Sequence, residues 1–276
     1  MRVNSISDVP CFCLPYLSAA RDGTSTHQVL SFMACEAEAI PADVDAVVIT
    51  SDLQVRTGGG AESGEDGVQL TERVIHTLAH EHRELSLPPP DRVGLLLAGD
   101  LHSKPIHAGR GGAGDVIPLL ALAPSVFRWV IAVTGNHDLL QSWPAPKNIH
   151  TRLRKLYPNL QVLDAEAHRQ GGVKFAGVCG VIGDPRKPSR RTDHEFADAL
   201  DHALRERPDV LLLHQGPHVE GLSRKSSPLV RAALDSHAVP LCICGHNPWP
   251  DCLVRLPSGT AILNVDHRVL LLKPGC

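Results

Sequence analysis

The residues best suited to chemistry in this chain stand where short apolar runs end. Carboxylate, amide and imidazole side chains bind divalent metal ions and transfer protons. Ligands of open α/β sheets lie outside the carboxyl ends of the strands, so groups that follow several strands are expected to converge. Such groups occur five times: Ser51-Asp52-Leu53-Gln54, Gly99-Asp100-Leu101-His102, Gly135-Asn136-His137-Asp138, His214-Gln215-Gly216-Pro217-His218 and Gly245-His246-Asn247.

The third group is the most specific of the five. Asn136, His137 and Asp138 are three adjacent polar residues after an apolar run, where core packing gives no reason for them. Glycine precedes Asp100, Asn136 and His246, and it lets the backbone turn sharply out of a sheet. A single Asp at a strand end is more often a turn or a helix cap. The ordered set of five therefore predicts the metal centre, and no single group does.

The elements that must position these groups alternate along the chain. Periodic apolar residues predict helices around Leu70–Leu78, Phe196–Leu204 and Ser227–Leu234, the last with a serine cap and a first-turn proline. Alternating strands and helices indicate the α/β class. Short runs rich in Val, Ile and Leu predict strands buried on both faces at Ala46–Thr50, Val93–Ala98, Trp129–Thr134, Val173–Val178, Val210–Leu213 and Leu241–Cys244.

The two ends of the chain depart from this alternation. Residues 1–43 show no clear period, and we interpret them as an N-terminal extension that packs on a domain formed by residues 44–276. Within the extension, Gln28–Ala39 is predicted as a helix. The tail is predicted to form a β-meander of short strands at Leu253–Leu256, Ala261–Val265 and Val269–Leu272.

Composition limits the classes of function. A chain of 276 residues with 43% hydrophobic residues suits one globular domain. The formal net charge of −3 gives no overall field for nucleic acid or anionic lipid. No apolar run reaches the ~18 residues of a membrane-spanning helix, and the N-terminus does not resemble a signal peptide, so we expect a cytoplasmic protein without a membrane partner. Cys242 and Cys244 alternate along one predicted strand and are interpreted as core residues.

The five groups resemble the signature of the calcineurin-like metallophosphoesterase superfamily. That signature runs D-x-H, G-D, G-N-H-[DE], a lone H and G-H-x-H, each after a strand and in this order. The resemblance covers roughly residues 44–270. It implies an α/β fold of four layers (α/β/β/α), in which a β-sandwich is flanked by helices on both sides.

The resemblance also implies roles for individual residues. Asp100 would bridge two metal ions, and Asp52 would belong to one of them. Asn136, His214 and His246 would complete the shell of the other ion. One or two ions per chain are expected. Mixed Asp, Asn and His ligation favours Mn²⁺ or Fe, with Zn²⁺ as an alternative.

Two further residues take roles in the reaction. By the same resemblance, His137 would lie near the leaving group and Asp138 would orient it. Two divalent ions about 3.5–4 Å apart clamp a phosphoryl group and supply a hydroxide nucleophile, so no side-chain nucleophile is needed.

The sequence departs from the signature at two ligands of the same ion. Gln54 stands at the histidine of D-x-H, and Pro248, which has no side-chain donor, stands at the last histidine of G-H-x-H. Gln54 retains a carbonyl oxygen as a weaker ligand. Three interpretations follow: a site with one firmly held ion, a replacement ligand from His102, His218 or His267, or a site that binds ligands without catalysis.

Candidate substrate-binding residues follow the Val173–Val178 run. Arg190 and Arg191 belong to the basic run 186–191, which we interpret as a phosphate-binding loop, with a solvated loop as the alternative. Arg224 and Lys225 form a second, weaker basic pair.

Other candidates point to the class of substrate. His102 and His218 could face the cleft, and Trp249 is the best-placed aromatic residue for stacking a base, ahead of Trp143. The first hypothesis is a hydrolase for a small phosphorylated substrate, either a phosphomonoester or a phosphodiester. The alternatives are a nuclease or nucleotide phosphodiesterase, and a metal-dependent binding module with the same fold.

Overall fold

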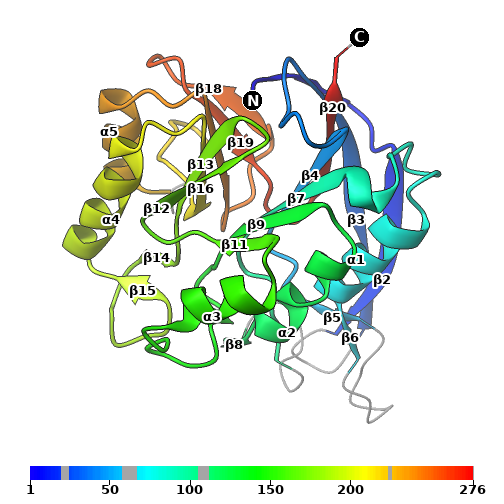
Figure 1. The fold of residues 1–276 in the computed structure, drawn as a ribbon, viewed down its shortest axis with the longest axis horizontal. Helices are drawn as coiled ribbons and strands as arrows, with labels where there is room; N and C mark the ends of the chain where they lie inside the picture. Colours follow the sequence, from blue (N-terminus) through cyan, green and yellow to red (C-terminus); the bar gives the residue numbers. More distant parts are fainter. Residues whose placement is uncertain (20–24, 58–66, 105–111, 223–225, 276) are drawn as a thin grey trace.

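Two β-sheets pack face to face, and helices cover the outer face of each sheet (Figure 1). The computed structural model describes residues 1–19, 25–57, 67–104, 112–222 and 226–275. The arrangement confirms the predicted four-layer α/β fold. Among the described residues, no helix is both long and apolar enough to cross a membrane.

The larger sheet carries the first three ligand groups on its central strands. β4, β7, β9 and β11 are parallel to one another, so Asp52, Asp100 and Asn136 follow strands that end at the same edge. β1 (Val3–Ile6) pairs with β3 outside the main order. The main order is β11 (Leu160–Val162), β9 (Trp129–Val133), β7 (Val93–Ala98), β4 (Ala46–Thr50), β20 (Val269–Pro274), β3 (Ser25–Ala37), β2 (Phe12–Ala19), β5 (Arg56–Thr57) and β6 (Val68–Gln69).

The smaller sheet carries the last two ligand groups on β16 and β17, which are parallel neighbours. Two short strand pairs lie outside both sheets: β8 (Gly114–Asp115) with β10 (Asp138–Leu139), and β14 (Val181–Ile182) with β15 (Arg190–Arg191). The smaller sheet has the order β12 (Glu166–Gln170), β13 (Val173–Val178), β16 (Val210–Gln215), β17 (Leu241–Gly245), β19 (Ala261–Asn264) and β18 (Leu253–Arg255).

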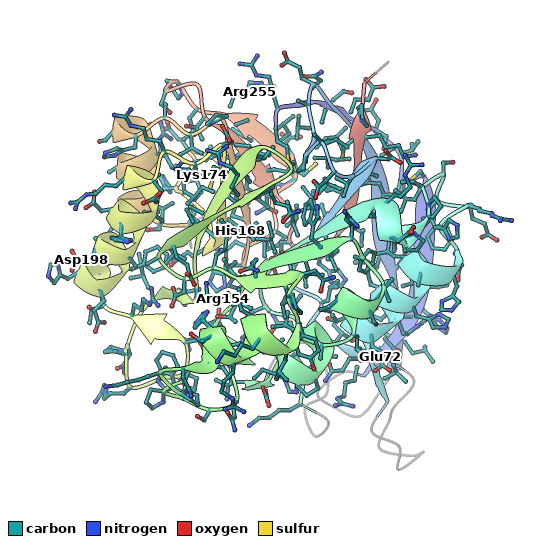
Figure 2. The ribbon with its side chains drawn as sticks, viewed as in Figure 1. Glu72, Arg154, His168, Lys174, Asp198 and Arg255 are labelled. Carbon is teal, nitrogen blue, oxygen red and sulfur yellow. The ribbon has the colours of Figure 1, made fainter. Side chains whose placement is uncertain are left out.

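The helices form the outer layers. α4 and α5 lie beside the smaller sheet, and α1 lies on the opposite side of the molecule (Figure 1). Polar side chains such as Glu72 on α1 and Asp198 on α4 are exposed (Figure 2). The helices are α1 (Leu70–His80), α2 (Ile117–Leu120), α3 (Ile149–Leu156), α4 (Asp193–Arg205) and α5 (Pro228–Ser236), with short 3₁₀ turns at Pro90–Arg92 and Ala123–Ser125.

Strand periodicity divides the apolar side chains between two cores. Val210 and Leu212 of β16 join the core that includes the space between the sheets, while Leu211 and Leu213 join the core under α4 and α5. Trp129 of β9 contacts Phe175 of β13 across the sandwich, with ring centroids 5.9 Å apart. β9 is buried along its whole length and on both faces, which is why its sequence is a continuous apolar run.

The structure corrects the prediction for Gln28–Ala39. This segment belongs to strand β3, which pairs with β2 on one side and with β20 on the other. Leu30 and Phe32 are fully buried on alternate positions. Two partner strands far away in the sequence supply the hydrogen bonds, and this tertiary context overrides the local helical pattern. Residues 1–43 therefore contribute strands to the larger sheet.

The predicted β-meander at the C-terminus is also wrong. β18 and β19 are antiparallel neighbours in the smaller sheet, but β20 crosses to the larger sheet and inserts between β3 and β4. Val269, Leu270, Leu271 and Leu272 are all buried. A strand buried on both faces is stabilised more in the interior of the larger sheet than it would be at the edge of the smaller one.

Candidate metal centre

Asp100, His214 and His246 form a cluster at the carboxyl ends of β7, β16 and β17. One ligand atom from each residue lies within 4.8 Å of the other two. Asp100 and His214 are fully buried. The cluster thus joins the two sheets, because its carboxylate comes from the larger sheet and both imidazoles come from the smaller one.

The ring of His214 is held in one orientation. Its Nδ1 donates a hydrogen bond to the carbonyl oxygen of Ala98 at 2.8 Å, since a carbonyl oxygen can only accept. Its Nε2 lies 3.1 Å from Oδ2 of Asp100. A backbone carbonyl that fixes one ring nitrogen and leaves the other toward the ligand cluster is typical of metal-binding histidines.

The electrostatics of the cluster keep its carboxylate charged. Burial opposes ionisation of Asp100, but the charge of His214 and its hydrogen bond hold the pKa of this carboxyl well below its usual range. Burial would lower the pKa of His214, whereas the Asp100 and Asp52 charges raise it to about 10. Burial and the His214 charge lower the pKa of His246 to about 3, so His246 is neutral at pH 7.

The backbone is strained where the ligands leave the strands. Asp52, Asp100 and His246 have positive φ angles of 57°, 53° and 69°. Such conformations are uncommon for residues other than glycine and cluster at functional sites. Position 135 requires glycine for a steric reason, because a Cβ there would lie 2.0 Å from Oδ1 of Asp100.

Two amide side chains leave buried oxygens without protein partners. Among the described residues, neither Oδ1 of Asn136 nor Oε1 of Gln54 finds a hydrogen-bond donor. Asn136 lies between Gly135 and His137, whose backbone N–H donates to Oδ1 of Asp100 at 2.8 Å. An unsatisfied buried acceptor costs about 1–3 kcal/mol, which a bound cation would recover. The donor set therefore fits a divalent metal ion.

Asp52 lies against the loop that carries His246. Its Oδ2 accepts hydrogen bonds from Oγ of Ser51 at 2.7 Å and from the backbone N–H of His246 at 2.8 Å. Asp52 thus couples the end of β4 to the end of β17. The role of Ser51 was not predicted, because a serine next to a ligand has no distinctive pattern in the sequence.

Comparison with known proteins agrees with this geometry. A family model described as calcineurin-like phosphoesterase matches residues 46–250. The chain belongs to the calcineurin-like phosphoesterase family. A search of curated proteins finds no match to this phosphoesterase.

Solved structures agree in fold. The phosphoesterase is similar to TT1561 of Thermus thermophilus, with 15% identity, a TM-score of 0.56, and coverage of 81% of this chain and 90% of that one. It is also similar to the phosphopantetheinyl hydrolase PptH from Mycobacterium tuberculosis, with 15% identity, a TM-score of 0.48, and coverage of 82% and 91%. At 15% identity the likeness to TT1561 concerns the fold alone.

His137 and Asp138 take different positions in the phosphoesterase. The ring of His137 is 30% exposed, and its Nε2 lies 4.0 Å from Oδ2 of Asp100, at the rim of the cluster. Asp138 is buried, and its carboxylate accepts backbone N–H groups from Leu101, His102 and Gly135 at 2.9, 3.1 and 3.0 Å. Burial and the Asp100 charge raise the pKa of Asp138 to about 6, against the effect of these donors. Asp138 therefore ties the loop after β7 to the loop after β9.

The three histidines considered as replacement ligands lie outside the cluster of Asp100, His214 and His246. His102 packs against Gly114, where a Cβ would lie 2.1 Å from its ring. His218 is exposed, and its Nδ1 lies 3.4 Å from Oγ of Ser226. The ring of His267 forms hydrogen bonds with the carbonyl oxygen of Asp52 at 3.2 Å and with the hydroxyl of Tyr16 at 2.7 Å.

The two arginines of the basic run differ in their partners. Arg191 forms an ion pair with Asp164 at 2.6 Å. Arg190 forms no ion pair with any described residue, and its charge helps to lower the pKa of His246. Arg190 is therefore the better candidate for substrate binding. Arg224 and Lys225 lie outside the described residues.

The prediction that Trp249 stacks a base is wrong. Its side chain is 2% exposed and packs in the core under α4 and α5. The turn after β17 directs it inward, where its large apolar area is removed from water. Trp143 is 40% exposed instead.

Proposed function

We propose that this phosphoesterase hydrolyses a phosphomonoester or phosphodiester of modest size with a metal-activated water. The observation that carries the proposal is the cluster of Asp100, His214 and His246 beside the unpartnered oxygen of Asn136. These four residues would hold one divalent ion, and Asp52 and Gln54 would contribute to a second, weaker position. An ion bound there supplies Lewis-acid polarisation of a phosphoryl oxygen and a hydroxide at neutral pH.

The chain's own residues do the remaining work. His137, at the rim of the cluster, would donate a proton to the leaving oxygen. Asp138 holds the two ligand loops together through its three backbone donors. The presence of His137 supports turnover over a binding module, because its ring at the rim of the cluster is not needed simply to hold a metal ion.

The proposal predicts hydrolysis of p-nitrophenyl phosphate or bis(p-nitrophenyl) phosphate by the full chain with added Mn²⁺, Fe²⁺ or Zn²⁺. Asp100→Ala should abolish metal binding and turnover, and His137→Ala should lower kcat by about 100-fold or more with the metal retained. Asp198→Asn on the exposed face of α4 is the matched control and should have no effect.

The two esters separate a monoesterase from a diesterase. No turnover of either ester with any of the three metals would instead favour the metal-binding module. Full activity of His137→Ala would contradict the role given to that residue. A cytoplasmic location stays a prediction.

A further inference from the structure

An open cleft lies beside the metal centre, on the side of the β14–β15 pair. It has a volume of about 530 Å³ and is lined by Trp143, Pro144, Pro185, Arg190, Arg191 and Glu195. Sites of about 300–1,000 Å³ accommodate small organic ligands. None of these residues belongs to the metal cluster, so the cleft is distinct from it.

Hydrogen bonds connect the β14–β15 pair, which lines the cleft, to the ends of the sheets that carry the metal ligands. Oγ of Ser189 donates to the carbonyl oxygen of Asp138 at 2.8 Å, one residue before the strand that carries Arg190. The backbone N–H of Ile182 donates to Oε1 of Gln215 at 2.8 Å, one residue after His214. The arginines of β15 are therefore held next to the loops that carry the ligands.

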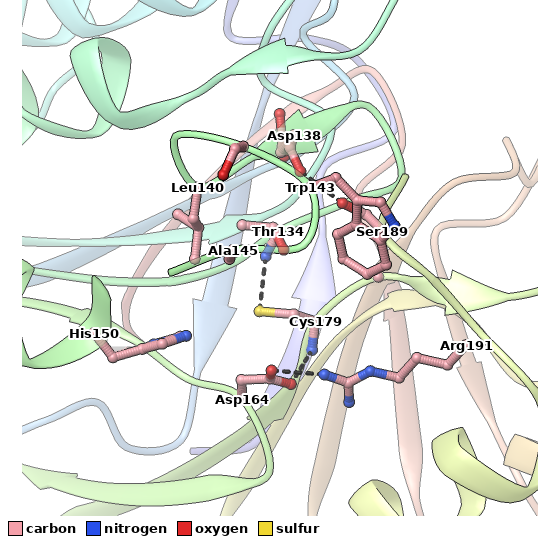
Figure 3. A pocket seen from close by; sticks show the side chains of 12 residues that line it. Thr134, Asp138, Leu140, Trp143, Ala145, His150, Asp164, Cys179, Ser189 and Arg191 are labelled. Atoms are coloured by element: carbon pink, nitrogen blue, oxygen red, sulfur yellow. Dashed lines mark hydrogen bonds and ion pairs between the residues drawn. The ribbon is translucent and has the colours of Figure 1, made fainter. Parts of the chain in front are cut away.

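Trp143 gives this cleft an aromatic wall. Its indole lies near Ser189 and Asp138 (Figure 3) and also borders a smaller pocket of about 70 Å³. Trp143 is 40% exposed, whereas Trp129 and Trp249 are each 2% exposed. A large aromatic side chain left at the surface beside two prolines offers a stacking surface for a planar ring.

Arg190 gives the cleft a positive charge that forms no ion pair with any described residue, although it acts at longer range on Asp184 and His246. The other two arginines of the run are already paired, Arg186 with Asp184 at 2.8 Å and Arg191 with Asp164 at 2.6 Å. A guanidinium without such a partner is suited to bind phosphate oxygens in a bidentate manner.

We propose that this cleft binds a nucleotide, with its base stacked on Trp143 and its phosphate bound by Arg190. The aromatic wall, the guanidinium of Arg190 and the volume match a nucleoside that carries a phosphoester. A simple alkyl or sugar phosphate has no planar ring to stack on the indole. The inference rests on the proposed function in one respect, that the phosphoester of the bound nucleotide is then hydrolysed. Binding of the nucleotide itself does not require hydrolysis.

The test is a titration of the full chain with adenosine 5′-monophosphate, in Mn²⁺ buffer, followed by tryptophan fluorescence. Trp143 is the tryptophan that a ligand can reach, so stacking should quench its emission. Ribose 5-phosphate, which has the phosphate but no base, should bind at least fivefold more weakly. Trp143→Leu should weaken nucleotide binding by about 5- to 150-fold, the usual range for one stacked base, and Trp143→Phe should restore part of it.

A matched pair of arginine variants tests the phosphate contact. Arg190→Gln should weaken binding of both ligands, whereas Arg186→Gln in the same loop should not, since Asp184 already neutralises Arg186. Calorimetry gives the dissociation constants of the tryptophan variants, which lose the fluorescence signal. Equal affinity for the two ligands, or an unchanged constant in Trp143→Leu, would overturn the proposal even if the p-nitrophenyl esters are hydrolysed. Nucleotide binding without hydrolysis of any ester would sustain it and overturn the proposed function.

Discussion

The two ring nitrogens of His214 have different partners, and this difference determines how the site takes up a cation. Nδ1 is bonded to the carbonyl oxygen of Ala98 at 2.8 Å, so the ring cannot turn without losing a buried hydrogen bond. Nε2 faces the carboxylate of Asp100 at 3.1 Å. Because Asp100 raises the pKa of His214 to about 10, the metal-free ring carries a proton that a cation must displace.

This linkage predicts that metal affinity rises with pH. Between pH 7 and 9, which lie below the pKa of about 10, binding should release one proton from His214, and affinity should increase about tenfold per pH unit. His246, whose pKa is lowered to about 3, is already neutral and should release none. Calorimetry of Mn²⁺ binding in buffers of different ionisation enthalpy counts the protons. An affinity that does not change between pH 7 and 9 would contradict the His214–Asp100 pairing.

A second prediction at this scale concerns Gly135. An alanine Cβ would lie 2.0 Å from Oδ1 of Asp100 and 2.5 Å from its backbone nitrogen, so Asp100 must move. Gly135→Ala should weaken metal binding by at least about tenfold, in line with the loss expected when a ligand is misoriented. Equilibrium dialysis measures this affinity, and circular dichroism checks the fold.

Gly275→Ala is the control for that substitution, because the atom nearest to its Cβ lies 3.9 Å away. It should leave metal affinity unchanged. Wild-type affinity in Gly135→Ala would mean that Asp100 is not held in its place by close contact with this turn.

The cluster ligands could be predicted from the sequence because their residue types and their order along the chain can be recognised without knowing the tertiary structure. Asp100 and His246 follow apolar strands and His214 ends the apolar part of β16, and such strands can be recognised locally. The partners of these residues depend on contacts across the fold, as for Arg191 with Asp164, 27 residues away. The burial of Trp249 depends on the direction of a turn, which a single aromatic residue does not encode.

At the scale of elements, strands buried on both faces were predicted nearly to the residue. β4 and β7 have the expected bounds because a continuous apolar run leaves few alternatives, and β13 has them although Lys174 interrupts its run. β3 was missed because its exposed N-terminal half interrupts the strand pattern. Its partners β2 and β20 lie at opposite ends of the chain, so pairing had to be known before the strand could be recognised.

At the scale of the whole molecule, the two ends of the chain interlock and reach the metal centre. β20 runs between β3 and β4, so the N-terminal strands are attached to the rest of the sheet through the last strand. Tyr16 of β2 bonds the ring of His267 at 2.7 Å, and that ring bonds the backbone oxygen of Asp52 at 3.2 Å. Residues 1–43 thus support both the sheet and the loop of a ligand residue.

The last prediction tests whether this N-terminal segment is integral to the fold. Phe32 of β3 is fully buried and packs edge-on against Phe12, with ring centroids 5.2 Å apart. Phe32→Ala should lower the free energy of unfolding by about 3–5 kcal/mol, measured by urea denaturation, because it removes a buried ring and leaves a cavity. Leu17→Ala in β2, at a side chain 38% exposed, is the control and should cost about 0.5 kcal/mol or less. Equal small losses in both variants would mean that the segment is an appendage whose unfolding is independent of the metal-binding sheets.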